Sequence, residues 1–152
     1  MSDGGRDDVG SPGGSGAEEQ PRPGPAGEVY DWYRRGVKLL DGGNPDAAAQ
    51  LLEHAHAEAP ESASVREALA RALFDAGRYA EAARFFRGLT SSRPDDDYAQ
   101  FGLGLALSRL GNFSAAVEHL ALAVAMRPQR EDYVRALRQA RATLRARGVG
   151  PA

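Results

Sequence analysis

A repeat of 34 residues constrains this chain more than any other feature of its sequence. Proline recurs at Pro60, Pro94 and Pro128, and four other registers recur with the same spacing in three copies. These registers are Gly43, Gly77 and Gly111; Ala48, Ala82 and Ala116; Leu39, Leu73 and Leu107; and the large apolar set Leu52, Phe86 and Leu120. A fixed period of about 20 to 50 residues indicates an array whose units bury their apolar faces by stacking on one another. The blocks are 29–62, 63–96 and 97–130.

Each block has the pattern of two helices joined by a turn. An Ala- and Leu-rich stretch is interrupted midway by Gly and closed by Pro, two residues that end helices. In the first inner turn, Gly43-Asn44-Pro45, an Asn at the predicted N-cap precedes a Pro at the first helical position. The three blocks therefore predict six helices and no strand.

The blocks resemble the tetratricopeptide repeat, whose unit places large, small and proline residues at fixed positions. The first block agrees with that pattern at Trp32, Gly36, Leu39, Gly43, Ala48, Leu52, Ala55 and Pro60. The second agrees at Leu69, Ala70, Leu73, Gly77, Tyr79, Ala82, Phe86 and Pro94, and the third at Leu103, Gly104, Leu107, Gly111, Phe113, Ala116, Leu120, Ala123 and Pro128. The blocks depart from it at Arg35, at Arg66 and Gln100 in the Trp position, and at Leu89.

The resemblance covers residues 29–130 and implies both a fold and a function. With one further helix at 131–147, it implies an all-α, right-handed helix-turn-helix solenoid of seven helices over residues 28–147. It also implies a non-enzymatic adaptor that binds another protein.

The start of the array is marked by polar residues where the inner blocks are apolar. In this family the third, tenth and fourteenth residues of a block face the preceding repeat. In blocks two and three these are Val65, Ala72 and Ala76, and Ala99, Ala106 and Leu110. The first block has Asp31, Lys38 and Gly42 there, as expected of a repeat with nothing before it.

Residues 131–147 are predicted to form a helix that closes the array. Tyr133, Ala140 and Leu144 take the three positions that face the preceding repeat, so this helix should pack on block three. Arginines occupy the side that would meet a missing second helix, and we expect that side to face water. With both ends closed in this way, we expect a monomer.

The arginines of this last helix leave an alternative function open. Arg135, Arg138, Arg141 and Arg145 could form a basic patch for nucleic acid or an acidic partner. The formal charge of the whole chain is −2, which gives no general attraction to nucleic acid. We therefore favour solvation of the closing helix over the basic patch.

Residues 1–27 and 148–152 lie outside the repeat. Twelve of the first 27 residues are Gly or Pro, so this acidic stretch cannot bury enough apolar surface to offset its chain entropy. We expect a disordered tail over 1–27 and a short flexible C-terminus over 148–152. The sequence shows neither a signal peptide nor a run of about 18 apolar residues, which predicts a cytoplasmic protein without membrane contacts. The Ala and Arg bias suggests a bacterial origin.

Composition and motifs argue against catalysis and against a metal. The chain has no Cys, and its single lysine, Lys38, lies outside any phosphate-binding loop motif. His54 and His56 are two residues apart on a predicted helix, so they point in nearly opposite directions and cannot share a metal ion. The run Asp95-Asp96-Asp97 suits a helix N-terminus. We therefore expect no enzyme activity, no cofactor and no metal ion.

The side of each first helix that neither neighbour buries is the predicted binding surface. In this family it lines a concave groove for an extended or helical segment of a partner protein. Its residues here are Tyr33, Arg34, Val37, Glu67, Arg71, Tyr98, Phe101 and Leu105. Glu67 and Arg71 are one turn apart and able to pair with each other or with a ligand. Clustered exposed aromatic residues favour a protein or peptide partner over an inert surface.

Some members of the family bind the C-terminal carboxylate of a chaperone through a clamp of Lys, Asn and Arg on this groove. The corresponding positions here hold Tyr33, Val37, Ala68, Tyr98 and Gly102. A chaperone-tail clamp is therefore not expected, and the identity of the partner stays open.

Overall fold

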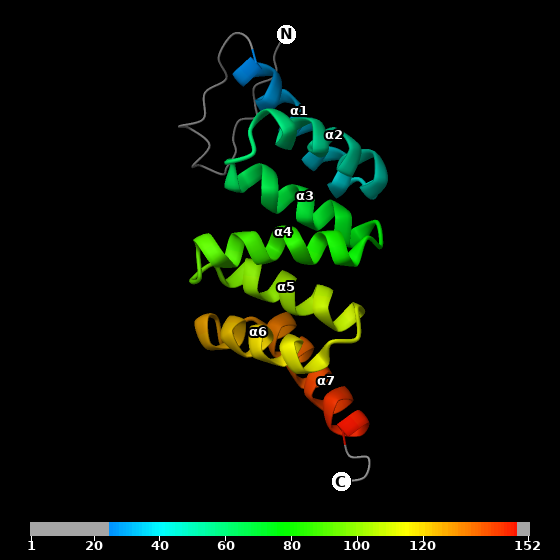
Figure 1. Cartoon of the computed structure of the whole chain (residues 1–152), viewed down its shortest axis with the longest axis vertical. Helices are drawn as coiled ribbons and strands as arrows, with labels where there is room; N and C mark the ends of the chain where they lie inside the picture. The colour runs from blue at the N-terminus through cyan, green and yellow to red at the C-terminus, as the bar shows by residue number, and fades with distance from the viewer. Residues whose placement is uncertain (1–24, 149–152) are drawn as a thin grey trace.

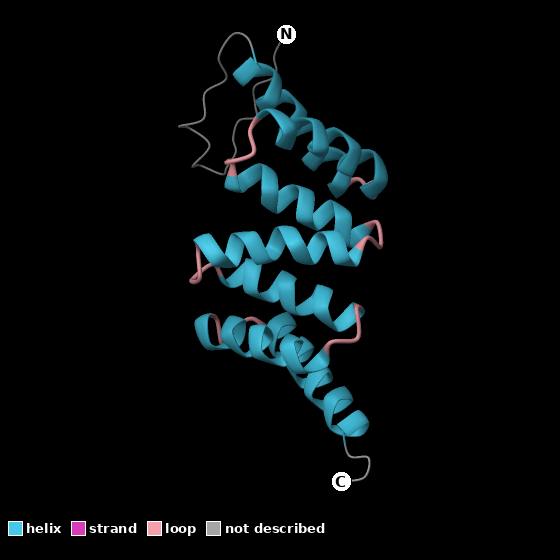
Figure 2. Cartoon of the chain, in the orientation of Figure 1, coloured by secondary structure: helices cyan, strands magenta, loops and turns pink. Residues whose placement is uncertain are grey.

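The computed structural model describes residues 25–148 and folds this part of the chain into seven α-helices without a strand. The helices are α1 (Pro25–Asp41), α2 (Pro45–Glu58), α3 (Ala63–Asp75), α4 (Tyr79–Ser92), α5 (Asp97–Arg109), α6 (Phe113–Met126) and α7 (Glu131–Gly148). They stack along the long axis of the molecule, with α1 and α2 at one end and α7 at the other (Figure 1). Short loops join them (Figure 2). The predicted all-α solenoid is confirmed.

Each predicted block folds into one helical hairpin. The pairs are α1 with α2, α3 with α4 and α5 with α6, and every helix packs on the one that follows it, through to α7. Helix α1 begins at Pro25, slightly before the predicted start of the array, because proline is favoured in the first turn of a helix. The rest of the predicted tail, 1–24, and residues 149–152 lie outside the described part of the chain.

The repeated glycines end the first helix of each hairpin. Gly43, Gly77 and Gly111 have φ angles of 84°, 83° and 86°, in the left-handed region that disfavours any residue with a Cβ. At each of them the chain closes the helix with the same two backbone hydrogen bonds. In the first hairpin these run from Gly43 N to Leu40 O (3.0 Å) and from Asn44 N to Leu39 O (2.9 Å). The 34-residue glycine register is therefore a register of helix ends.

The N-termini of α3, α5 and α6 are capped by short polar side chains, whereas those of α2 and α4 are not. Ser62 accepts from Val65 N (3.2 Å), Asp96 from Ala99 N (3.0 Å) and Asn112 from Ala115 N (3.2 Å). Asn44, the predicted cap of α2, makes no such bond and instead donates from Nδ2 to Gly42 O (3.4 Å). Pro45 follows it at the start of α2, and its fixed φ begins that helix without the capping bond.

Large side chains of the second helices fit into gaps left by glycine on the first helices. A Cβ added to Gly36 would lie 2.6 Å from Cγ of Leu52, and one added to Gly104 would lie 2.6 Å from Cγ of Leu120. Both leucines are fully buried. Because nothing but hydrogen fits in these gaps, the two helices of the first hairpin and those of the third can approach closely.

Gln100 replaces the tryptophan of the family pattern and is buried with its polar atoms satisfied. Its Nε2 donates to the carbonyl of Pro94 (3.0 Å), so its Oε1 is left to accept from Nδ1 of His119 (2.8 Å). Burial, helped by Arg87, lowers the pKa of His119. A neutral imidazole thus completes the bonding of the buried amide.

The two ends of the array differ as predicted, whereas one residue predicted to pack inside the array, Leu110, does not. Asp31 and Lys38 are exposed on α1, whereas Tyr133 and Ala140 are buried on α7. Leu110, expected to pack on the preceding repeat, is 48% exposed. It is the C-cap residue of α5, so it lies past the last full turn that contacts the neighbouring helices.

Replacement of Phe86 by alanine should destabilise the array strongly. Its side chain is 2% exposed, so Phe86→Ala leaves a cavity and should lower the free energy of unfolding by about 2 to 5 kcal/mol in urea denaturation. The matched control is Leu122→Ala, because Leu122 is 48% exposed and its loss should change stability by less than about 0.5 kcal/mol. A cost below about 1 kcal/mol for Phe86→Ala would contradict the packing described above.

Candidate binding pocket between the second and third repeats

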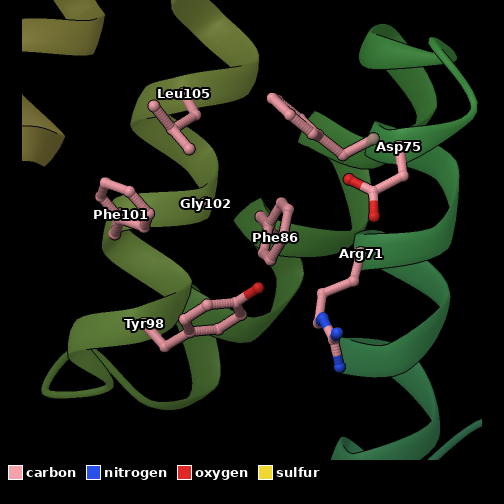
Figure 3. A pocket seen from close by; sticks show the side chains of 8 residues that line it. Arg71, Asp75, Phe86, Tyr98, Phe101, Gly102 and Leu105 are labelled. Carbon is pink, nitrogen blue, oxygen red and sulfur yellow. The ribbon is translucent and has the colours of Figure 1, made fainter. Parts of the chain in front are cut away.

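A small open pocket lies between α3 and α5, the first helices of the second and third hairpins (Figure 3). Its volume is about 60 Å³, enough for the end of one side chain. The pocket is lined by Arg71, Phe74, Asp75, Phe86, Tyr98, Phe101, Gly102 and Leu105. Four of the eight residues predicted for the groove therefore meet here: Arg71, Tyr98, Phe101 and Leu105.

The floor of the pocket depends on a missing side chain. A Cβ on Gly102 would lie 2.4 Å from Cε1 of Phe86, so only glycine lets the Phe86 ring reach α5. The repeat pattern had placed Phe86 only in the large apolar register with Leu52 and Leu120, and it gave Phe86 no role at a binding surface. The signal that could have revealed the floor is Gly102, which has no counterpart among the repeated glycines.

The α5 side of the pocket is aromatic and is held by the closing helix. Tyr98 meets Phe86 edge to face, with ring centroids 6.1 Å apart, and burial raises the pKa of its phenol. Phe101 stacks on Tyr133 of α7 at 4.5 Å, and the Tyr133 hydroxyl donates to Asp97 Oδ2 (2.7 Å). Phe101 is therefore half-buried between the pocket and α7, rather than a purely exposed groove residue.

The α3 side of the pocket carries charge. Nη2 of Arg71 lies 3.5 Å from Oδ1 of Asp41, at the end of α1. This pair replaces the predicted pairing of Arg71 with Glu67, since within residues 25–148 no ion pair joins those two side chains. The guanidinium of Arg71 thus reaches back to the last residue of α1, in the preceding repeat.

Glu67 sits one turn before Arg71 and is half-buried. Burial raises the pKa of its carboxyl group, and the nearby carboxylate of Asp96 raises it further, against the opposing effect of Arg71. Glu67 therefore lies on α3 close to the pocket without lining it.

The remaining predicted groove residues lie on α1, away from this pocket. Tyr33 and Val37 are half-buried and pack against the core cluster. Arg34 is exposed, with its guanidinium carbon 5.8 Å from the centre of the Tyr30 ring. The structure thus divides the predicted groove into an α3–α5 pocket and a separate α1 surface.

The arginines of the predicted basic patch are exposed on α7. Arg135, Arg138, Arg141 and Arg145 each lie on the solvent side of that helix, and among the described residues none of them pairs with a carboxylate. Arg147 lies over the ring of Phe113, 4.8 Å from its centre. The four arginines of the patch are therefore accessible to a ligand.

The described residues show neither a candidate metal site nor a membrane-spanning helix. In residues 25–148, no three His, Asp or Glu side chains come together in a way that could hold a metal ion. In the same part of the chain no helix combines the length and the apolar character needed to cross a membrane.

A sequence profile of the tetratricopeptide repeat matches residues 39–100 and 73–141, more than half of the chain. The chain belongs to the tetratricopeptide repeat family. Proteins of this family are generally non-catalytic modules that bind other proteins, and the chain has the fold of such an adaptor. A comparison with curated protein sequences found no match.

Solved structures share the fold of this tetratricopeptide repeat protein. MamA MSR-1 superposes with a TM-score of 0.71 at 24% identity, over 81% of this chain and 71% of that one. MamA 41-end from Desulfovibrio magneticus RS-1 gives 0.72 at 19% identity, over 76% and 65%. The first TPR of Spaghetti (RPAP3), bound to the HSP90 peptide SRMEEVD, gives 0.71 at 17% identity, over 77% and 93%. At these identities the likeness is one of fold.

The raised pKa of Glu67 predicts a specific effect on stability. Its folded-state pKa lies above the unfolded value, so its favourable contribution is complete below the unfolded pKa and is lost as the pH rises through the folded one. Glu67→Gln should therefore melt above the parent at about pH 7, and the difference should disappear near pH 3.5. The same change at exposed Glu118 on α6 is the control and should not shift melting at either pH. A lower melting temperature for Glu67→Gln at pH 7 would contradict this account.

Proposed function

We propose that this protein is an adaptor that binds a segment of another protein in the groove between α3 and α5. The observation that carries the proposal is the pocket itself, which combines a phenylalanine floor with aromatic and aliphatic walls. A side chain inserted there would cover apolar surface and gain affinity from a site whose walls are already held in place.

The rigidity of the α5 wall supports this proposal. Phe101 is stacked on Tyr133, and the Tyr133 hydroxyl is tied to Asp97, so the wall need not be ordered when a partner arrives. Preformed walls reduce the entropy lost on binding. The α1 surface of Tyr33, Arg34 and Val37 would extend the contact toward the first repeat.

The RPAP3 domain shares the fold, but its bound peptide does not transfer to this chain. The positions at which chaperone-binding members of the family carry a basic and polar clamp hold Tyr33, Val37, Ala68, Tyr98 and Gly102 here. None of these can bind a carboxylate through a charged side chain. We therefore propose a ligand other than an acidic chaperone tail.

Removal of the pocket walls should abolish partner binding while the fold persists. A degenerate peptide library screened against the full chain supplies a fluorescent probe peptide. Tyr98→Ala combined with Leu105→Ala should weaken binding of that peptide by about a hundredfold in fluorescence anisotropy, because anchoring side chains commonly contribute about 2 kcal/mol or more.

A control and a second variant distinguish loss of binding from loss of folding. Leu122→Ala changes an exposed leucine on α6 and should bind the peptide as the parent does. Leu105→Ala alone should reduce binding by about tenfold with little change in melting, since Leu105 lines the pocket and is only half-buried. If the double variant is folded and binds like the parent, the pocket is not the site.

The exposed arginines of α7 favour a second candidate, a site for nucleic acid or an acidic partner. Replacement of Arg135, Arg138, Arg141 and Arg145 by Gln should leave both melting and peptide binding unchanged if the pocket is the site. Duplex DNA provides the opposite test. An affinity of the parent for DNA that falls steeply between about 50 and 200 mM salt, and that the fourfold variant loses, would support the second candidate.

A further inference from the structure

A carboxylate without a partner faces the α3–α5 pocket. Asp75 is the last residue of α3 and lines the pocket, and Figure 3 shows its carboxylate turned toward Phe86. Among residues 25–148, no hydrogen bond or ion pair engages it. The equivalent acidic residue of the first repeat is paired, so the unpaired state of Asp75 beside aromatic walls is specific to this position.

The repeat register explains why Asp75 lacks a partner. One repeat earlier, Asp41 holds the equivalent place and is paired with Arg71 at 3.5 Å. A shift of 34 residues turns Asp41 into Asp75 and Arg71 into Leu105. The third repeat therefore offers a leucine where the second offers a guanidinium, and this exchange both leaves Asp75 unneutralised and makes the pocket wall apolar.

The cations near Asp75 are engaged elsewhere. Figure 3 shows the guanidinium of Arg71 turned away from Asp75, consistent with its contact to Asp41. The guanidinium carbon of Arg109 lies 5.1 Å from the centre of the Phe74 ring and 5.3 Å from that of Tyr79, and its Nη1 donates to the Tyr79 hydroxyl (2.8 Å). With Arg71 and Arg109 engaged in these contacts, neither neutralises the carboxylate of Asp75.

We propose that the α3–α5 pocket receives a basic side chain, preferably arginine, from the partner segment. The inference rests on the proposed function and names the chemistry of its ligand. The methylene groups of the side chain would lie against Tyr98, Phe101 and Leu105, and the cationic head would reach Asp75. Arginine is favoured over lysine because its planar, weakly hydrated head both stacks on aromatic rings and bonds a carboxylate in a bidentate way.

Charge favours a basic side chain of a separate partner over the N-terminal segment of the same chain as the occupant of the pocket. Residues 1–24 contain five acidic side chains and two arginines, Arg6 and Arg22. Such a segment is repelled by Asp75 and Glu67 more than it is attracted. A separate partner with a basic anchor is the better electrostatic match.

The test uses synthetic peptides that differ at one fixed position in an otherwise degenerate background. That position carries Arg, Lys, Leu or Glu, and binding to the full-length protein is measured by fluorescence anisotropy. The parent should bind the Arg series best, and Asp75→Asn should weaken that series by about tenfold while leaving the Leu series unchanged. Asp75→Lys should reverse the preference toward Glu. Both variants should fold, since Asp75 is exposed and a cation at a helix C-terminus is favourable.

A matched control and a competitor complete the experiment. Asp46→Asn makes the same chemical change at an exposed position on α2 and should retain the parent's preference for Arg. A free peptide of residues 1–24 should not displace the Arg series from the full chain. Displacement by that peptide would overturn the proposal, because the chain's own segment would then be the occupant.

The failure of this inference and the failure of the proposed function give different results. If the parent prefers Leu or Glu peptides, or if Asp75→Asn keeps the Arg preference, the proposal of a basic ligand is wrong. Loss of binding in the Tyr98 and Leu105 variants would still support the pocket as the binding site. If those pocket variants bind normally, the pocket itself is wrong. If no series binds the parent, both proposals fail.

Discussion

The array depends on large side chains of its second helices that fit into gaps left by glycine on neighbouring first helices. Leu52 and Leu120 occupy such gaps at Gly36 and Gly104, within their own hairpins. A single methyl group at either glycine would lie 2.6 Å from the leucine, so each hairpin can close only in the absence of that group. Close hairpins then present continuous apolar faces to one another, and stacking of these faces buries the core.

The second hairpin has no glycine gap of its own, and its large side chain packs on a glycine of the next repeat instead. The pocket results from this difference. Ala70 stands at the register of Gly36 and Gly104 and carries the Cβ that they lack. Phe86, larger than the two leucines, reaches instead to Gly102 of the next repeat. One ring thereby links the second and third repeats and forms the floor of the opening between α3 and α5. The candidate site thus lies at a place where the repeat departs from its own pattern.

The ion pair between neighbouring repeats also fails to recur at the pocket. The pair of Asp41 with Arg71 joins the first and second repeats, and its absence one repeat later leaves Asp75 facing an apolar wall. The closing helix is part of the site as well, because Tyr133 supports Phe101 and is tied to Asp97. Residues from three successive repeat units therefore hold the pocket, and each contributes a side chain that the consensus pattern does not specify.

The sequence by itself determined the number of helices, the register of their ends and the polar character of both termini of the array. These features are local or periodic: Gly43, Gly77 and Gly111 stop helices through their own backbone, and apolar positions recur with the helical period. Only the tertiary structure decided which partners the side chains took. Arg71 lay one turn from Glu67 in sequence yet pairs with Asp41, and Phe86 looked like any core residue until Gly102 was placed against it. Such choices depend on distances between helices that a helical periodicity does not contain.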